Sequence, residues 1–410
     1  MNALRMDLLK IIEKLADTSG SFYLYDERKI AENIINLQSN FTDIKFLYSV
    51  KCNNNKNVLK SVFGKGLGAD AASVREVFLA RGCGLSKEEI YYSAPGKSLD
   101  DIKAAIDNSV IIADSVLEVE QLNKLAKERS ETLEVGIRLN PNFTFFADNG
   151  VASKFGIDEE QAAKFIIQEK YRNLNIVGIH VHLKSQELNA SVLKRYYEKM
   201  ISLAEQFSDL CGSLKFINMG SGLGIPYGKT EKPLNLVELG ASLHEKFKQF
   251  KHKFPNTELL IETGRFVVGD SGSYVTRVLD KKISHGTTYL ILQNTLNGFI
   301  RPSIERLVAH YSKDKNPIGC EPLFTCKNAF EIQPLTDNTG RETVTLVGNL
   351  CTSSDIVAEK IEMPCMEPGD AIIISNAGAY GAVLSPMQFS SLNKPQEFFL
   401  TLDGKIKSNV

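Results

Sequence analysis

Between Lys45 and Glu262 the sequence alternates short apolar runs with longer amphipathic stretches, and this alternation limits the possible folds more than any other feature. The short β-branched runs predict buried strands, and the stretches between them predict helices. Strands separated by helices form parallel βαβ units, and about eight such units are present, the number at which a parallel sheet closes. We therefore expect a (β/α)8 barrel. An open doubly wound sheet is the alternative, but the only glycine-rich turn, Gly220–Gly224, comes late and lacks GxGxxG spacing.

The pattern changes after the barrel segment to short β-branched runs such as Ala371–Ser375, with turn residues between them. We expect the barrel over residues 26–266 and a second, antiparallel β-domain over residues 267–410. Residues 1–25 are expected to join this second domain through a strand near Ser21–Tyr25. A chain of 410 residues is also too long for one ordinary core.

Charge and composition exclude several classes of protein. A formal net charge of −1 gives no overall field that attracts nucleic acid or an anionic membrane. No apolar run approaches the ~20 residues of a spanning helix, and the N-terminus lacks the apolar core of a signal peptide. The seven cysteines lack CxxC spacing, so we expect reduced thiols, no metal site and a cytoplasmic protein.

Lys51 stands where the apolar run Phe46–Val50 breaks into an asparagine-rich segment. A lysine half shielded by apolar walls loses its proton readily and becomes an amine nucleophile. The ordinary alternative is a strand-end lysine that extends into solvent. Active sites of such barrels collect at the carboxyl ends of the strands. The other candidates at predicted strand ends are Asp70, Arg138, His182, the turn Gly220–Gly224 and Glu262.

These residue types together suit a pyridoxal phosphate site. A lysine amine such as that of Lys51 can hold an aldehyde, and the N–H groups of Gly220–Gly224 can approach a phosphate. Glu262 can hydrogen-bond a heterocycle nitrogen, and His182 can stack on a ring. Each residue alone also has an ordinary structural explanation, such as packing for one of His180 and His182. Their joint placement at strand ends favours the cofactor site.

The segment Tyr48–Ser–Val–Lys51–Cys–Asn53 resembles the Y-x-x-K-x-N motif of the alanine-racemase-like, fold-type III pyridoxal phosphate enzymes. The chain is most similar to their diaminopimelate, ornithine and arginine decarboxylase branch. Further motifs follow in the same order nearly end to end: Gly68–Ser73, Ser153–Gly156, His182–Gln186, Gly220–Gly224, Glu262–Arg265, Gly348–Thr352 and Gly378–Gly381.

This resemblance implies an alanine-racemase-like barrel plus a C-terminal β-domain, working as a head-to-tail homodimer with shared active sites. It implies that Lys51 holds the cofactor aldehyde, His182 stacks on the pyridine face and Glu262 pairs with the ring nitrogen. It implies that Cys351 of the partner subunit protonates the carbanion after carbon dioxide leaves. The other implied cofactor-binding residues, most of them around the phosphate, are Asp70, Arg138, Ser185, Gly220, Ser221, Gly222, Gly264, Arg265 and Tyr380.

Glu262 favours decarboxylation over racemisation. An acid beside the pyridine nitrogen keeps that nitrogen protonated, so the ring is a strong electron sink. The racemases of this fold, by the same resemblance, carry an arginine there. Cys351 is a moderate acid suited to delivering one proton, with a buried core cysteine as the alternative explanation.

The residue after Cys351 departs from the family pattern. Decarboxylases of diamino acids usually carry an acid there, which binds the distal ammonium, whereas this chain has Thr352, with Asp355 three residues later. A buried cation needs a charged partner. The Cys–Thr pair is similar to the specialised decarboxylases of siderophore and antibiotic pathways, which act on citryl-diaminopropionate or carrier-linked glutamate. Thr352, Asp355 and Arg301 are the candidate substrate-binding residues, and Arg301 fits a distal carboxylate or a surface position equally well.

The sequence therefore predicts a cytoplasmic, homodimeric, pyridoxal phosphate-dependent α-decarboxylase. Its substrate would be a small-molecule amino acid whose side chain is modified or conjugated, possibly linked to a carrier protein. One alternative is a diaminopimelate decarboxylase that makes L-lysine. The other is a non-catalytic, antizyme-like regulatory protein that binds the cofactor. The presence of Lys51, His182, Glu262, Cys351 and Tyr380 argues against the regulatory protein.

Overall fold

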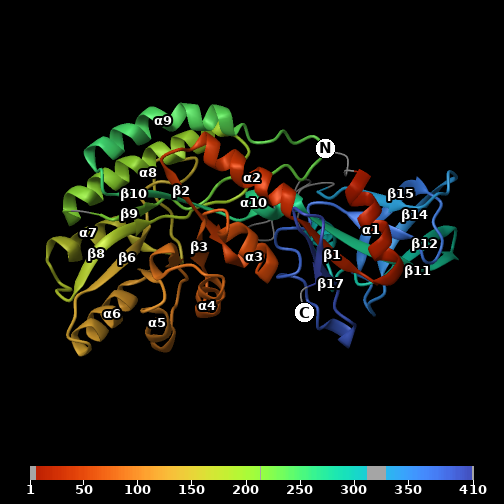
Figure 1. The fold of residues 1–410 in the computed structure, drawn as a ribbon, viewed down its shortest axis with the longest axis horizontal. Coiled ribbons are helices and arrows are strands. Elements are labelled where there is room, and N and C mark those ends of the chain that lie inside the picture. Colours follow the sequence, from red (N-terminus) through yellow and green to blue (C-terminus); the bar gives the residue numbers. More distant parts are fainter. Residues whose placement is uncertain (1–5, 213, 312–328, 409–410) are drawn as a thin grey trace. The chain divides into compact units, whose positions relative to one another are not determined.

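The computed structural model describes residues 6–212, 214–311 and 329–408, and the chain divides into two compact units (Figure 1). The barrel unit comprises Ala31–Gly224 and Pro233–Gly264. The β-unit comprises Met1–Ile30, Ile225–Lys232 and Arg265–Val410, so the segment after the glycine-rich turn belongs to the β-unit.

Within the described residues, eight parallel strands close the barrel unit. β10 pairs with both β2 and β9, and β5 pairs with β6, so the ring of strands is complete. The closure confirms the predicted (β/α)8 barrel and excludes the open sheet. The strands are β2 (Ile44–Ser49), β3 (Gly68–Ala71), β4 (Ile90–Tyr92), β5 (Val110–Ala113), β6 (Leu133–Asn140), β8 (Leu174–His180), β9 (Phe216–Asn218) and β10 (Glu258–Thr263), and β7 (Ile157–Asp158) pairs only with β6.

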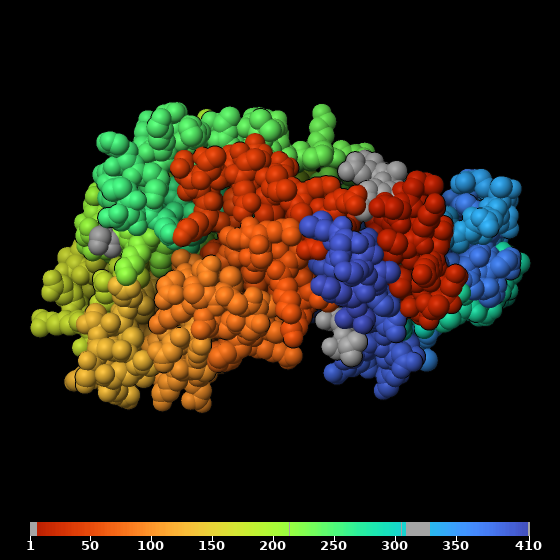
Figure 2. All heavy atoms as spheres, viewed as in Figure 1, coloured from red at the N-terminus to blue at the C-terminus, as the bar shows by residue number. Residues whose placement is uncertain are grey.

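Helices connect these strands. In the space-filling view the side chains of the orange helices α3 to α5 cover one face of the barrel unit (Figure 2). Several helices start at an asparagine or serine whose side chain accepts backbone N–H groups of the first turn, as at Asn55 and Ser73. The helices are α2 (Glu27–Asn40), α3 (Lys56–Phe63), α4 (Val74–Gly82), α5 (Leu99–Ala105), α6 (Val116–Glu128), α7 (Glu159–Ile167), α8 (Ala190–Cys211) and α9 (Leu236–Lys253), with the 3-10 turns η1 (Val50–Cys52) and η2 (Lys87–Glu89).

The β-unit is built on a mixed sheet. β1 pairs antiparallel with β11 and parallel with β17, so the strand near Ser21–Tyr25 joins this sheet as predicted. Most pairs are antiparallel, but β1–β17 and β12–β14 are parallel, and a long stretch of chain separates the two strands of each parallel pair, as parallel pairing requires. The strands are β1 (Phe22–Asp26), β11 (Gly272–Ser284), β12 (Thr287–Leu292), β13 (Ile332–Leu335), β14 (Arg341–Gly348), β15 (Ile356–Pro364), β16 (Ala371–Ile374), β17 (Gln396–Leu400) and β18 (Ile406–Ser408).

Helices also contribute to the β-unit. The apolar face of α1 (Met6–Thr18), with Leu8, Ile12 and Ala16, packs in one core cluster with Phe22 of β1. α11 (Arg301–Tyr311) interrupts the region where we expected only strands, and it begins next to Pro302, a residue favoured at helix starts. The remaining turns are α10 (Arg265–Val268), η3 (Gly269–Ser271) and η4 (Phe389–Ser391).

No helix in the described part of the chain is long and apolar enough to cross a membrane. The cysteines that the structure describes carry free thiols: Cys52, Cys83, Cys211, Cys351 and Cys365. Cys320 and Cys326 lie outside the described residues.

The barrel interior is filled around Phe216 of β9. Its ring lies edge-on to Tyr91, with 5.0 Å between ring centroids, in a cluster that also contains Leu47, Ile112, Val177 and Leu260. The ring covers Gly178 of β8, where a Cβ atom would overlap it. The glycine and the aromatic ring therefore fill the centre of the barrel together.

We predict that Phe216→Ala lowers the free energy of unfolding by about 3–5 kcal/mol, because the barrel cannot collapse into the cavity left by the ring. Urea-induced unfolding followed by circular dichroism measures this loss. Phe78→Ala, at a 47% exposed side chain, is the matched control and should change the midpoint little. Equal shifts in the two variants would contradict this account of the core.

Candidate active site

Lys51 lies in the 3-10 turn directly after β2, held by a buried carboxylate. Its Nζ is 3.1 Å from Oδ2 of Asp70, the second-last residue of β3, which is 1% exposed. The hydroxyls of Ser49 and Ser93 donate to the same carboxylate at 2.8 and 3.0 Å. The lysine side chain itself is 40% exposed. A fixed anion thus orients an amine that an aldehyde can still reach.

Glu262 lies next to the last residue of β10, and its carboxylate is buried, with the residue 1% exposed. Asn218 donates to its Oε1 at 2.9 Å, and Nε2 of His180 lies 3.0 Å from the same oxygen. Burial alone would raise the pKa of Glu262, but His180, which lies within hydrogen-bonding distance, and the ammonium of Lys51 hold that pKa below its ordinary value. Glu262 is therefore an anion in a dehydrated site, able to hydrogen-bond a protonated ring nitrogen.

His182 is a neutral imidazole in this site. Its Nδ1 accepts the backbone N–H of Ser221 at 3.1 Å, so the proton of the neutral ring is on Nε2. Burial lowers the pKa of His182 to about 3. Lys51 and Arg138 also lower this pKa, whereas Glu262 raises it. The 3.5 Å approach of Nδ1 to Glu262 is therefore not an ion pair. The sequence predicted that one of His180 and His182 serves packing, whereas both approach Glu262.

The glycine-rich turn after β9 is shaped by these same residues. Gly220 has φ of 64°, and a Cβ atom there would overlap the carbonyl oxygen of Val181. The N–H of Gly220 donates to Oδ1 of Asn218 at 3.0 Å, and the carbonyl of Gly222 accepts the N–H of Glu187 at 2.7 Å. Ser185 lies in the adjoining loop after β8, half-buried. Gly264 follows β10, where a Cβ atom would lie 2.8 Å from Cβ of Cys52.

Arg138, at the end of β6, belongs to a chain of buried charges. Its Nη1 lies 3.2 Å from Asp114, and its Nη2 donates to the carbonyl of His182 at 3.4 Å. The backbone N–H of Asp114 donates to Glu118 at 2.8 Å, and Glu118 pairs with Lys97 at 2.7 Å. The Lys97 and Glu118 side chains are 0% and 3% exposed. Burial lowers the pKa of Lys97 and raises that of Asp114, although the opposite charges partly compensate.

In the β-unit, two buried arginines share one phenol. Arg265 and Arg301 donate to the hydroxyl of Tyr227 at 2.8 and 3.2 Å. Arg265 also lies over the ring of Tyr380, 4.9 Å from its centroid, and Tyr380 has φ of 54°, unusual for a residue with a side chain. Arg301 also donates to the carbonyl of Ala379. Because Arg301 is 2% exposed, a surface position for it is excluded.

The segment that follows β14 carries Cys351, Thr352 and Asp355. Cys351 is exposed, which excludes the buried core cysteine. The hydroxyl of Thr352 lies 2.8 Å from that of Ser354. Asp355, in contrast, is 2% exposed and accepts backbone N–H groups of Leu296 and Leu350. Its role as a substrate contact stays a prediction.

The sequence did not single out Asn218, Tyr227, Lys97 or Glu118, and it did not foresee that His180 reaches Glu262. Asn218 lies two residues before the glycine-rich turn, a position that could have marked it. Tyr227 stands in Ile225–Pro–Tyr–Gly228 directly after the same turn. The other partners depend on contacts between distant segments.

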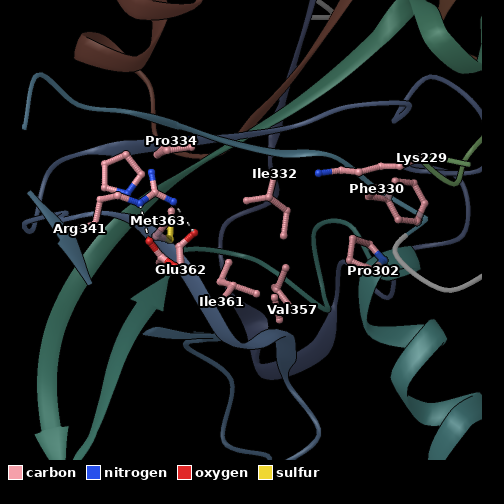
Figure 3. Close-up of a pocket in the computed structure, with 12 residues that line it drawn as sticks. Lys229, Pro302, Phe330, Ile332, Pro334, Arg341, Val357, Ile361, Glu362 and Met363 are labelled. Carbon is pink, nitrogen blue, oxygen red and sulfur yellow. Dashed lines mark hydrogen bonds and ion pairs between the residues drawn. The ribbon is translucent and has the colours of Figure 1, made fainter. Parts of the chain in front are cut away.

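A pocket of about 470 Å³ opens in the β-unit between β13 and β15 (Figure 3). Its walls include Ile332, Val357 and Ile361, and the ion pair of Arg341 with Glu362 lies at one end. None of the predicted site residues lines this pocket.

Parallel barrels collect their active sites at the carboxyl ends of the strands, which is where Lys51, Asp70 and Glu262 lie. Residues 27–269 match the family model described as pyridoxal-dependent decarboxylase, pyridoxal binding domain. The chain therefore belongs to this family, and it is an amino-acid decarboxylase whose cofactor is pyridoxal phosphate.

Individual relatives are similar to this protein over nearly the whole chain. The L-glutamyl-[BtrI acyl-carrier protein] decarboxylase of Niallia circulans is 31% identical, covering 92% of this chain and 87% of that protein. The diaminopimelate decarboxylase of Aquifex aeolicus is 29% identical, covering 91% of this chain and 85% of that protein. The crystal structure of diaminopimelate decarboxylase from Helicobacter pylori complexed with L-lysine superimposes with a TM-score of 0.81 at 26% identity, over 97% and 95% of the two chains.

We predict that Glu118→Gln destabilises the protein by about 3 kcal/mol or more, because it leaves the buried ammonium of Lys97 without its counter-charge. Urea-induced unfolding measures the loss. Glu120→Gln, on the same helix, is the matched control, since Glu120 pairs with Lys170 in solvent and its removal should have no measurable effect. If the two variants unfold at the same urea concentration, the buried pair does not support the barrel as described.

Proposed function

We propose that this decarboxylase removes the α-carboxyl group of an amino acid whose side chain is modified or conjugated, as in siderophore or antibiotic intermediates. The observation that carries this proposal is the hydroxyl at Thr352, where diamino-acid decarboxylases usually have a carboxylate. Its hydroxyl lies against that of Ser354, 2.8 Å away, and Ser353 between them is exposed. Such a segment suits a neutral, hydrogen-bonding distal group, because a dehydrated ammonium needs an anionic partner.

The cofactor supplies an electron sink for the pair of electrons left when the carboxyl group departs. Lys51 holds its aldehyde, and Asp70 keeps the lysine amine at the strand ends. Glu262 hydrogen-bonds the ring nitrogen as an anion, and neutral His182 stacks on the ring without adding a positive charge. Cys351 delivers one proton to the substrate carbon. We assign the remaining contacts with the cofactor to Arg138, Ser185, Gly220, Ser221, Gly222, Gly264, Arg265 and Tyr380.

Arg301 and the carrier-linked relative point to the kind of side chain that is bound. Arg301 is a buried guanidinium that donates to the Tyr227 hydroxyl and the Ala379 carbonyl. Guanidinium groups bind carboxylates through paired hydrogen bonds, so we propose that Arg301 contacts a second carboxylate on the substrate. The relative from Niallia circulans acts on glutamate attached to an acyl-carrier protein. We therefore propose that the substrate is acidic or amide-linked at its distal end and is small or carried on a protein.

The second candidate is decarboxylation of diaminopimelate to L-lysine. It is favoured by the similarity to diaminopimelate decarboxylases, including the structure with L-lysine bound. A distal carboxylate on that substrate would also suit Arg301, whereas Thr352 supplies no charge for its distal ammonium.

We predict that the cofactor-loaded protein releases carbon dioxide from citryl-diaminopropionate or carrier-linked glutamate faster than from lysine, ornithine or meso-diaminopimelate. Thr352→Glu should reverse part of this preference, by roughly tenfold in kcat/KM, since a new carboxylate pairs with a distal ammonium. Manometry or a coupled carbon dioxide assay measures both. Fast turnover of meso-diaminopimelate by the unaltered protein would instead assign it to lysine synthesis.

We also propose a cytoplasmic homodimer in which Cys351 of the partner subunit completes each site. Lys51→Ala and Cys351→Ala should each be nearly inactive alone. Mixing and reassociating them in equal amounts should restore about a quarter of the activity, because half of the dimers then contain one intact site. Size-exclusion chromatography gives the assembly state. Absence of any recovery in a mixture shown to contain heterodimers would mean that each subunit uses its own thiol.

A further inference from the structure

The carboxylate of Asp355 ties together two segments of the β-unit that are far apart in the sequence. One oxygen accepts the hydroxyl of Thr295 and the backbone N–H of Leu296, the latter at 3.0 Å. The other oxygen accepts the N–H of Leu350 at 3.2 Å. Asp355 is 2% exposed, so its carboxylate is shielded from water.

This arrangement leaves little capacity for a ligand. A carboxylate offers about four acceptor positions, and the protein's own donors already use three of those of Asp355. A substrate ammonium would have to enter a dehydrated site and displace a backbone N–H, which would then be left unsatisfied. Asp355 is therefore a structural link between the two segments, and its three hydrogen bonds to Thr295, Leu296 and Leu350 are together called the tie.

The last residue of β14, Gly348, is fitted to this tie. A Cβ atom on Gly348 would overlap both the Thr295 hydroxyl and the Asp355 carboxylate. Its N–H donates to the backbone carbonyl of Asp355 at 2.9 Å. Only a residue without a side chain lets the three segments approach one another this closely.

The segment at the Thr295 end is held by residues that lie just before β1 and β17. The side-chain amide of Asn294 donates to Ser21 at 2.8 Å and to the carbonyl of Asn393 at 2.7 Å. Its backbone N–H donates to the side chain of Asn349 at 3.1 Å. Thr295, the next residue, therefore presents its hydroxyl to Asp355 from a fixed position.

From Thr295 the chain runs directly into α11, which begins at Arg301. The carbonyl of Thr295 accepts the N–H of Gly298 at 3.0 Å, and the Gly298 carbonyl accepts the hydroxyl of Tyr23 at 2.6 Å. The same rigid turn therefore leads on one side to the start of α11 and is bound on the other to the segment that carries Cys351.

We propose that Asp355 is a positioning residue, which fixes the Cys351–Thr352 segment to the Thr295 turn, and that it is not a ligand of the substrate. The carboxylate acts through the backbone N–H of Leu350, the residue before the thiol. Its loss would let the thiol move away from the position from which it delivers its proton. Only the kinetic measurement below depends on the proposed function, because the thiol can be probed without any substrate.

Two substitutions test this from opposite sides of the tie, Asp355→Asn and Thr295→Val. In the cofactor-loaded protein we expect both to change the rate of Cys351 alkylation by iodoacetamide by roughly threefold or more, since both loosen the same segment. Mass spectrometry of the Cys351 peptide gives the rate. We expect both to lower kcat, and the double variant to be little worse than either single one, because they break one shared bond.

Asp280→Asn is the matched control, since Asp280 is exposed in the same unit and accepts the backbone N–H of its neighbour Lys281; it should behave like the unaltered protein. An Asp355→Asn variant with a raised KM and unchanged alkylation, beside a Thr295→Val variant like the unaltered protein, would make Asp355 a substrate ligand and overturn the proposal. Unchanged alkylation in both variants would overturn it even if the protein turned over none of the substrates tested.

Discussion

The need to keep one carboxylate ionised in a dehydrated position at the strand ends of the barrel shapes the site more than any other constraint. A buried anion without compensation is too costly to persist, so Glu262 is surrounded by the amide of Asn218 and the rings of His180 and His182. Asn218 and His182 each have a second role, as acceptors of backbone N–H groups. Asn218 also accepts the N–H of Gly220, and His182 accepts that of Ser221. The residues that stabilise the acid therefore also set the conformation of the glycine-rich turn.

A second set of buried charges stiffens the neighbouring strand ends. Lys97, Glu118, Asp114 and Arg138 form a continuous series that ends at the carbonyl of His182. Such series are stable only when every member has a partner, and each link here joins a different strand end or helix. His182, which is proposed to stack on the cofactor, is thus held from two directions, through its ring by Ser221 and through its backbone carbonyl by Arg138.

Hydrophobic periodicity was sufficient to predict the barrel and the strand-end placement of Lys51, Asp70 and Glu262. Parallel strands of a barrel all end on one side, so a polar residue after an apolar run is placed by its position alone. The partners of these residues could not be predicted in the same way. His180 lies within an apolar run and looks like a packed residue, and the pair of Lys97 with Glu118 exists only once segments 21 residues apart have met. The parallel pairing of β1 with β17 likewise depends on the two ends of the chain.

The ties at Leu350 and Asp355 have a consequence for how this protein can change over evolutionary time. They fix the two ends of a short segment by bonds that do not involve the side chains of Thr352, Ser353 or Ser354. Those three positions can accept new side chains while the surrounding sheet keeps its stability, since exposed or partly exposed positions away from such bonds tolerate substitution. A descendant enzyme could therefore acquire a different substrate range by point mutation within this segment, without compensating changes elsewhere in the fold.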